Sequence, residues 1–319
     1  MVARPLPEFM DRSSLDRSCF LAIFLGAWIF VGLYALFALT RNGTTAYFFL
    51  AVPFVTGSVV SLTVNFREQI FKSTLLSLFV NGLITLVFLP EGTVCLLMAS
   101  PIILIMTLFG AWGCSLTRYG GDPKKPRKLL SLLLGGILVF SAADSYLMAS
   151  RSEQITQTEF VLDGSRDEIW ARLSFDRQPR APMPGWLDWW MHAPEKYAFG
   201  GEGLNAQRYV DFGPAQAGDD EDRPRGKIIF MVTRWEPGQS VEFTCSDNQT
   251  RLDKWIDLGV TRVELIDEKT VEVAGAKTRV RLTTQWRRKL GPGFYFTPFL
   301  RAGVAEAHQV LAAELREQP

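Results

Sequence analysis

Histidine and cysteine are scarce in this chain of 319 residues, and their scarcity limits the metal and redox chemistry that it can support. There are two histidines, His192 and His308, and four cysteines. Cys245 is the one cysteine outside the apolar N-terminal stretches, so the C-terminal half cannot close an internal disulfide. The sequence has no Cys/His spacing typical of a zinc site, and we expect no metal or cofactor.

An excess of charge of one sign is also missing. The chain has 34 Lys and Arg against 33 Asp and Glu, and from Arg151 onward acidic residues outnumber basic ones by 26 to 23. A nucleic-acid-binding protein usually carries a basic excess, so we expect no nucleic acid partner. Walker, GxSxG and HExxH motifs are absent, which argues against phosphate-loop, serine-hydrolase and zinc-protease chemistry.

The N-terminal part does contain long stretches without charge. A membrane-spanning helix needs about 20 apolar residues. The composition therefore predicts an α-helical transmembrane region of five helices within residues 1–150. Asp144 is the one ionisable residue inside these stretches and lies close to the end of the last, which favours an anchor over a transport path. The predicted spans are about 19–40, 46–66, 73–90, 92–114 and 129–149.

The distribution of Lys and Arg between the loops predicts the orientation. Alternate loops hold 10 positive charges against 1, and the richer set includes the N-terminal tail. Positively charged loops stay in the cytoplasm. We therefore expect a multi-pass protein of a bacterial inner membrane, with a cytoplasmic N-terminus and an extracytoplasmic, periplasmic domain over 152–319. Its partners would include membrane lipids, and small residues in the last span permit a homo-oligomer.

The second half has the pattern of an α+β domain. Strand patterns occupy 154–162, 206–213, 226–236, 239–246, 260–267, 270–275 and 277–288, and helices are predicted at 166–173 and 298–317. Ser165 and Glu168 have capping-box spacing. In 277–288, Val280, Leu282, Thr284 and Trp286 face one way, which predicts one packed and one wet face. The order favours a curved antiparallel sheet around a long C-terminal helix.

Particular segments carry a family resemblance. The run from Glu159 to Trp170 resembles the opening strand, turn and short helix of the SRPBCC superfamily, the group of START domains, polyketide cyclases and birch-pollen allergens. The approach to the last helix, 293–298, and the run from Gly201 to Arg208 are also similar to that family. The resemblance covers about 155–318. It implies a helix-grip fold with a hydrophobic ligand cavity, without implying a shared reaction.

The predicted function is a membrane-anchored binding protein for a hydrophobic or amphipathic molecule such as a lipid, a quinone or a polyketide-like compound. Glu202 and Arg208 are candidates for polar contacts at the cavity mouth, or for a surface ion pair. His308 is either a ligand contact or a buried structural residue. The candidate ligand-binding residues, chosen from strand parity and aromatic content, are Trp186, Trp189, Trp190, Phe230, Trp235, Phe243, Trp286, Phe299 and His308.

Two alternative functions follow from the same residues. The first is a cyclase, dehydratase or hydrolase that pairs His308 with Glu202 or Asp211 as acid and base. The second is a protein-interaction domain without a ligand, which would present a large exposed apolar patch. The tryptophan-rich segment 182–192 is either a gate over the cavity or core packing beneath a loop.

Overall fold

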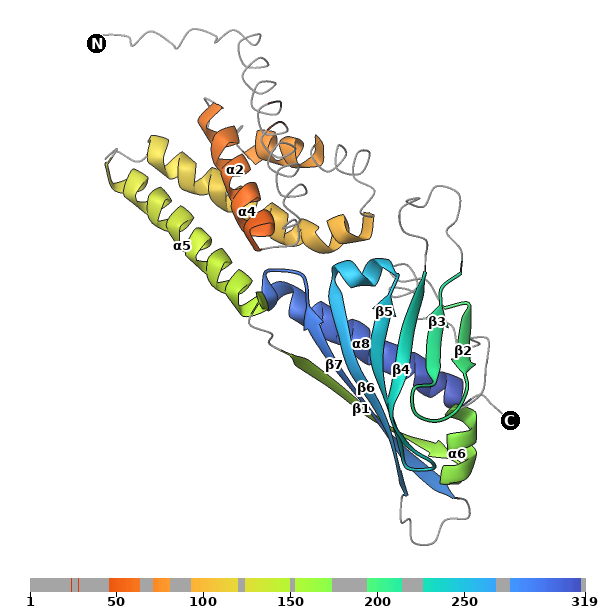
Figure 1. Cartoon of the computed structure of the whole chain (residues 1–319). Helices are drawn as coiled ribbons and strands as arrows, with labels where there is room; N and C mark the ends of the chain where they lie inside the picture. The colour runs from red at the N-terminus through yellow and green to blue at the C-terminus, as the bar shows by residue number, and fades with distance from the viewer. Residues whose placement is uncertain are drawn as a thin grey trace, which may run out of the picture. The chain divides into compact units, whose positions relative to one another are not determined.

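The computed structural model describes residues 24, 28, 46–63, 71–80, 93–119, 124–149, 153–173, 194–213, 226–267 and 276–316. The chain separates into two compact units, Met1–Tyr146 and Leu147–Pro319. The first is helical and the second contains the sheet (Figure 1).

Helices make up the described part of the first unit. They are η1 (Tyr47–Ala51), which is a π-helix, α2 (Val52–Thr63), a segment at Phe71–Val80, α4 (Thr93–Tyr119) and α5 (Lys124–Ala149). Among the described helices, one stretch, Met98–Leu116 in α4, is both long and apolar enough to cross a membrane, and half of it is buried. Because core helices of soluble proteins also pass this test, the five-span arrangement stays a prediction. The first predicted span, 19–40, lies almost wholly outside the described residues.

Helices α2 and α4 pack in close backbone contact at two glycines. A Cβ added at Gly57 would overlap the carbonyl oxygen of Thr107, and one added at Gly110 would overlap that of Phe54. The Ser58 hydroxyl also donates to the Gly110 carbonyl at 3.3 Å. By contrast, no neighbouring residue in the described ranges lies within 4 Å of a Cβ added at Gly135 or Gly136 in α5. The close approach of α2 and α4 therefore depends on Gly57 and Gly110.

The second unit is a seven-stranded antiparallel sheet curled around α8 (Gly293–Arg316) (Figure 1). The strand order is β1-β7-β6-β5-β4-β3-β2, so the first strand pairs with the last. Helix α6 (Arg166–Leu173) follows β1. This is a helix-grip fold over about half of the chain, as predicted. The strands are β1 (Gln154–Asp163), β2 (Lys196–Gly200), β3 (Gln207–Asp211), β4 (Lys227–Glu236), β5 (Ser240–Asn248), β6 (Ile256–Asp267) and β7 (Lys277–Arg288).

Several elements differ from their predicted bounds. Strand β2 falls in a stretch predicted to be irregular, because a five-residue edge strand is too short to establish an alternating pattern. β6 begins four residues before the predicted 260, since Gly259 and a bulge between Leu258 and Thr261 interrupt the alternation. α8 begins at Gly293, whereas the prediction took Pro298 as its first turn. The predicted strand 270–275 lies outside the described residues.

The packed face of the sheet matches the predicted parity. In β7 the burial alternates strictly, with Val280, Leu282, Thr284 and Trp286 inside. The predicted capping box also forms: the Ser165 amide donates to Glu168 Oε2 at 2.9 Å, and the Glu168 amide donates to Ser165 Oγ at 3.3 Å. It fixes the start of α6 directly after β1.

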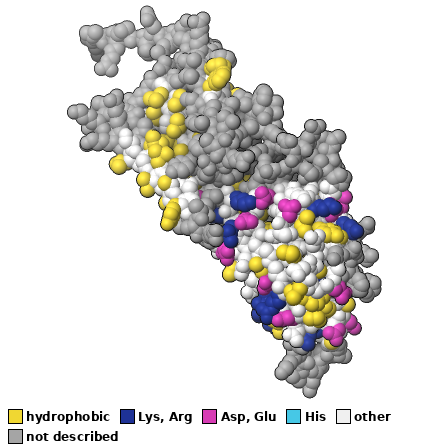
Figure 2. Space-filling model, viewed as in Figure 1, with side chains coloured by type: hydrophobic (Ala, Val, Ile, Leu, Met, Phe, Trp, Pro, Cys, Tyr) yellow, Lys and Arg dark blue, Asp and Glu magenta, His cyan; other side chains and the backbone are white. Residues whose placement is uncertain are grey.

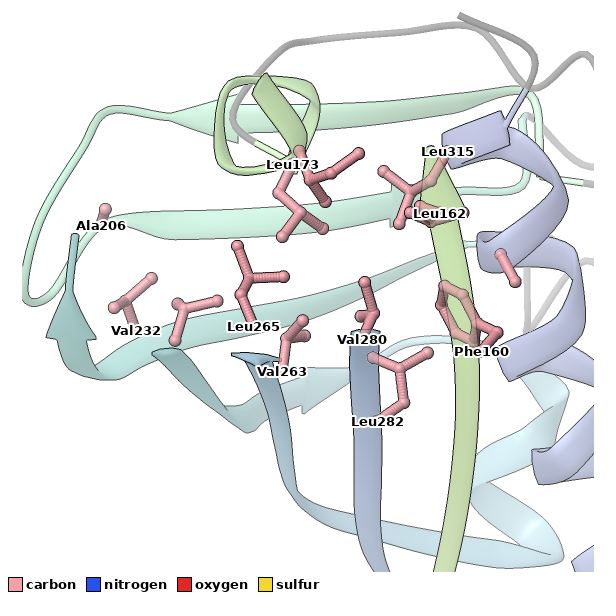
Figure 3. Close-up of a cluster of buried hydrophobic side chains, with 13 residues drawn as sticks. Phe160, Leu162, Leu173, Ala206, Val232, Val263, Leu265, Val280, Leu282 and Leu315 are labelled. Carbon is pink, nitrogen blue, oxygen red and sulfur yellow. The ribbon is translucent and has the colours of Figure 1, made fainter. Parts of the chain in front are cut away.

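Two hydrophobic clusters hold α8 against the sheet. The larger joins α6, the sheet and the C-terminal end of the helix, where Leu315 belongs to the same cluster as Leu162 and Leu282 (Figure 3). The smaller lies at the helix N-terminal half and contains Ile256, Trp286 and Leu300. The helix is therefore fixed at both ends, with the middle of its inner face left between the clusters.

The opposite face of the sheet is charged and wet. Arg281 lies between two carboxylates, with Nε 2.6 Å from Glu159 Oε1 and Nη1 3.5 Å from Glu264 Oε2. The hydrogen bond from Arg281 lowers the pKa of the Glu159 carboxyl. Basic and acidic side chains are interspersed over this domain in Figure 2. Such exposed pairs add little stability, but they keep this face in water and direct the core to the other side.

Candidate functional site

A cavity of about 280 Å³ lies between α8 and the concave face of the sheet. The helix contributes a stripe at helical spacing, from Leu300 through Val304 and His308 to Leu311. The floor comes from β2 to β7, and the 3-10 turn η2 (Arg251–Lys254) closes one side through Leu252. The volume is about nine times the share of one water molecule in the liquid, so it suits a small molecule.

The cavity lies on the inner face of the helix, between the two clusters. Leu300 belongs to the smaller cluster and Val304 packs on it. Leu311 packs on the larger cluster. Between them the helix presents Gly303 and Ala307 to the cavity. Small side chains at these two positions leave a space that larger residues would fill.

His308 joins the helix to the sheet through hydroxyl groups on both sides of its ring. Nδ1 lies 3.0 Å from Thr158 Oγ1 on β1, and Nε2 lies 2.8 Å from Thr284 Oγ1 on β7. Thr284 Oγ1 is in turn 3.1 Å from Thr261 Oγ1 on β6. Thr261, Thr284 and His308 all line the cavity. The imidazole is therefore buried and hydrogen-bonded while one of its edges belongs to the cavity wall.

Burial lowers the pKa of His308 to about 4, because an apolar surrounding disfavours the imidazolium. The unfolded chain, with a histidine pKa of about 6.5, binds the extra proton first. Stability should therefore be full above about pH 6.5 and fall as the pH drops toward 4, by about 3 kcal/mol at most.

We expect His308→Gln, which cannot titrate, to remove this part of the pH dependence. The measurement is hydrogen–deuterium exchange of β7 peptides in the intact chain at pH 7, 6, 5 and 4. The surface carboxylates titrate in both proteins, so the difference between the two curves isolates His308. Identical pH slopes for the wild type and the variant would contradict the assignment.

Arg208 is the one residue with a formal charge among the described residues that line the cavity. It is 8% exposed, so it is buried and does not lie at the surface. Its Nη1 donates to the Leu173 carbonyl at 3.1 Å, and its guanidinium lies 4.7 Å from the centre of the Phe243 ring and 5.6 Å from that of Trp235. Two aromatic faces and a carbonyl thus stabilise the buried cation.

The turn before β3 accounts for the glycines in the run from Gly201 to Arg208. Gly201 and Gly203 have φ values of 115° and 94°, which are costly for residues with a Cβ. The turn ends where the Val232 amide donates to the Ala206 carbonyl at 2.9 Å. This bond sets the start of β3 and the inward parity of Arg208.

The structure places the candidate residues in three kinds of position. Phe230, Phe243, Arg208 and His308 line the cavity. Trp235 packs on the larger cluster against Trp170, and Trp286 is the centre of the smaller cluster, so neither belongs to the lining. Phe299 is 42% exposed and Glu202 is exposed, and both lie outside the lining. Trp186, Trp189, Trp190, the predicted gate 182–192 and His192 lie outside the described residues.

The acid–base pair of the enzymatic alternative is not assembled around His308. Both ring nitrogens meet threonine hydroxyls. Asp211 instead accepts from the Gly213 amide at 3.0 Å and lies 3.1 Å from Lys227 Nζ. No group of three or more His, Cys, Asp or Glu side chains suited to a metal ion occurs among the described residues.

Sequence reasoning did not find the threonines of the site. Threonine is common in strands, so a single threonine in an alternating pattern indicates only a strand. The signal was the coincidence of Thr158, Thr261 and Thr284 at inward-facing positions of three strands that are neighbours in the sheet. That coincidence depends on the strand order and register, which the sequence alone does not give.

No protein-family model and no curated protein matches this chain. Solved structures are similar over the C-terminal half. Norcoclaurine synthase from Thalictrum flavum, in complex with dopamine and hydroxybenzaldehyde, is 15% identical, with 52% of this chain and 90% of that chain covered and a TM-score of 0.29. The Aha1 dimer from Colwellia psychrerythraea is 17% identical, with 51% and 97% covered and a TM-score of 0.29.

A conserved protein of unknown function from Enterococcus faecalis is 15% identical, with 55% of this chain and 81% of that chain covered and a TM-score of 0.28. Likenesses at these values carry no conclusion about ligand or activity. The helix-grip description rests on the strand order and the long C-terminal helix of this chain itself.

Proposed function

We propose that the helix-grip domain binds a small hydrophobic or amphipathic molecule in the cavity between α8 and the sheet. The observation that carries the proposal is the cavity itself: it separates two packed clusters, and apolar side chains such as Ile228, Val263 and Leu311 dominate its lining. A cavity of this size in an otherwise packed domain loses contacts that a ligand would restore. The resemblance of this half to the SRPBCC superfamily supports the same function.

Filling the cavity should abolish binding without unfolding the domain. Ala307 lines the cavity yet is exposed, so Ala307→Phe can place a ring at the cavity without displacing a buried side chain. We expect the affinity for naphthalene, an apolar probe of suitable size, to fall by tenfold or more, which is about 1.4 kcal/mol. Naphthalene binding to the purified intact chain is measured by its fluorescence.

The matched control is Ala302→Phe, an exposed position of the same helix that does not line the cavity. It should bind naphthalene like the wild type. Equal affinities of the wild type and both variants would place binding elsewhere. No binding by the wild type would overturn the proposed function. Native mass spectrometry of the intact chain, followed by organic extraction, would then identify any natural ligand that co-purifies.

We further propose that the first unit anchors this domain to a membrane, with the N-terminus in the cytoplasm and the C-terminal domain outside it. The arrangement of side chains in the described helices supports this. Large apolar residues face outward, including Phe79, Ile105, Trp112, Leu132 and Val139. Buried positions hold apolar residues such as Phe54 and Ile103 together with many hydroxyls, which are Thr56, Ser61, Ser73, Thr74, Ser77, Thr107 and Ser141.

Exposed large apolar residues and buried hydroxyls are what a lipid environment favours. Helices in lipid gain nothing by burying large apolar residues, and they associate through small and hydroxyl side chains. The Thr56 hydroxyl donates to the Val52 carbonyl, one helical turn back, at 2.9 Å. The Thr107 hydroxyl donates in the same way to the Ile103 carbonyl at 2.7 Å. Such back-bonding satisfies a hydroxyl without water.

A reporter fused after residue 319 tests the orientation. We expect alkaline phosphatase, which folds only outside the cytoplasm, to be active at this position, and a fusion after residue 69 to be inactive. Both fusions should stay in the membrane fraction after carbonate washing. An inactive reporter after residue 319, or release by carbonate, would refute the topology or the anchor respectively.

A further inference from the structure

A chain of hydrogen bonds runs from the edge of the sheet into the cavity. Its members are Thr158, His308, Thr284 and Thr261, joined by separations of 3.0, 2.8 and 3.1 Å. Thr158 does not line the cavity, whereas Thr261, at the other end, is half-buried in its wall. Phe243, the cross-strand partner of Thr261, extends the same row of the sheet toward Arg208.

The proton content of this chain allows two states when the imidazole is neutral. In the first, Nδ1–H of His308 donates to Thr158, so Nε2 accepts from Thr284 and Thr284 accepts from Thr261. The Thr261 hydroxyl then donates its proton to Thr284, and the Thr261 oxygen presents lone pairs to the cavity. In the second, Nε2–H donates to Thr284, Thr284 donates to Thr261, and the Thr261 proton is available to the cavity. The histidine tautomer thus decides whether Thr261 offers an acceptor or a donor.

We propose that Thr261 is the polar anchor of the ligand, and that the ligand is an uncharged apolar molecule bearing a hydroxyl or carbonyl oxygen. The inference rests on the proposed ligand-binding function. Because either tautomer completes the chain of hydrogen bonds, the same site accepts a donor group from an alcohol or phenol and donates to a ketone. The site would therefore hold both members of a hydroxyl–carbonyl pair of equal shape.

A neutral group fits this site better than an anion. The low pKa of His308 keeps the imidazole uncharged at neutral pH, so the chain supplies hydrogen bonds without a counter-charge. Arg208, the cationic residue among the described lining, lies over the Phe243 ring and donates from Nη1 to the Leu173 carbonyl. An oxygen facing Thr261 gains a hydrogen bond, whereas a carboxylate there would lose its hydration without an opposite charge.

The test compares four probes of similar shape on the intact chain: naphthalene, 2-naphthol, 1-tetralone and 2-naphthoate. We expect 2-naphthol and 1-tetralone to bind about five- to tenfold more tightly than naphthalene, as one net hydrogen bond allows. Thr261→Val should remove this advantage, so that 2-naphthol and 1-tetralone bind to the variant no more tightly than naphthalene does. Thr283→Val is the matched control, because Thr283 lies on the other face of β7 and should keep the advantage.

The histidine tautomer provides a readout that packing alone would not change. A ketone only accepts, so bound 1-tetralone requires Thr261 to donate, and His308 must then carry its proton on Nε2. With two histidines in the chain, ¹⁵N-histidine labelling gives two imidazole signals, and His192→Gln assigns them. We expect saturation with 1-tetralone to leave His308 in the Nε2–H form, and Thr261→Val to abolish any shift toward it.

The outcomes separate this inference from the function on which it rests. Naphthalene binding without an advantage for either oxygen-bearing probe would overturn the anchor alone. An advantage that persists in Thr261→Val, or tightest binding of 2-naphthoate, would move the anchor to another group such as Arg208 and overturn it as well. A His308 proton on Nδ1 in the tetralone complex would refute the relay. Failure of all four probes to bind would overturn the proposed function too.

Discussion

Replacing Trp286 by alanine is expected to lower the free energy of unfolding of the helix-grip domain by about 3–5 kcal/mol. The indole is 1% exposed and forms the centre of the smaller cluster with Ile256 and Leu300. Its Nε1–H donates to Thr156 Oγ1 at 2.9 Å, so the variant also leaves a buried hydroxyl without this donor. A loss of this size is a large fraction of the stability of an ordinary domain.

Two variants test whether burial is the cause. Trp286→Phe keeps most of the buried ring and removes the N–H donor, so it should cost about 1–2 kcal/mol. Phe299→Ala removes a ring that is 42% exposed and should cost less than either. The measurement is urea-dependent hydrogen exchange of β6 and β7 peptides in the intact chain. A loss for Trp286→Ala no larger than that for Phe299→Ala would contradict the central place of this indole.

Replacing Gly57 by alanine should separate α2 from α4. The added methyl group would overlap the carbonyl oxygen of Thr107, which is backbone and cannot rotate away. The helices must therefore move apart, which also weakens the contact of Ser58 with the Gly110 carbonyl. We expect a loss of about 1–3 kcal/mol, the usual range for overpacking, seen as faster hydrogen exchange in peptides of both helices.

Gly135→Ala is the matched control, since no neighbour among the described residues lies within 4 Å of the added methyl group and alanine favours a helix over glycine. It should leave exchange unchanged or slower. Equal behaviour of the two variants would mean that the close approach of α2 and α4 is not required. Faster exchange in Gly135→Ala would instead indicate a contact of α5 with another molecule, such as a second copy of the chain.

The sequence allowed the sheet and its packed face to be predicted because these depend on local alternation. β7 shows this best, with Val280, Leu282, Thr284 and Trp286 all inside as expected. His308 lies on the inner stripe of α8 and lines the cavity. Phe299 does not line it, because it precedes His308 by nine positions, and at about 100° per residue the two lie about 180° apart around the helix. Leu300 occupies the inner position instead.

The depth at which a side chain is buried was harder to predict than the face of the sheet on which it lies. Trp286 and Phe243 both face inward, yet one fills a cluster and the other lines the cavity. Arg208 is a charged residue beside a turn, which usually indicates a surface position. Its burial depends on Phe243, Trp235 and Leu173, which other elements bring to it. Strand parity predicts the face of the sheet on which a side chain lies. The distance between α8 and the sheet decides whether that side chain fills a cluster or lines the cavity.

Helix α8 is attached to the sheet at both ends, and several residues that line the cavity belong to neither of the clusters that attach it. Leu315 and its neighbours secure one end, and Trp286 with Leu300 secures the other. Positions between them, such as Ala307 and Thr261, can change without dismantling either cluster. Mutation can therefore change the lining of the cavity at little risk to folding, which makes this domain a suitable starting point for engineering small-molecule sensors.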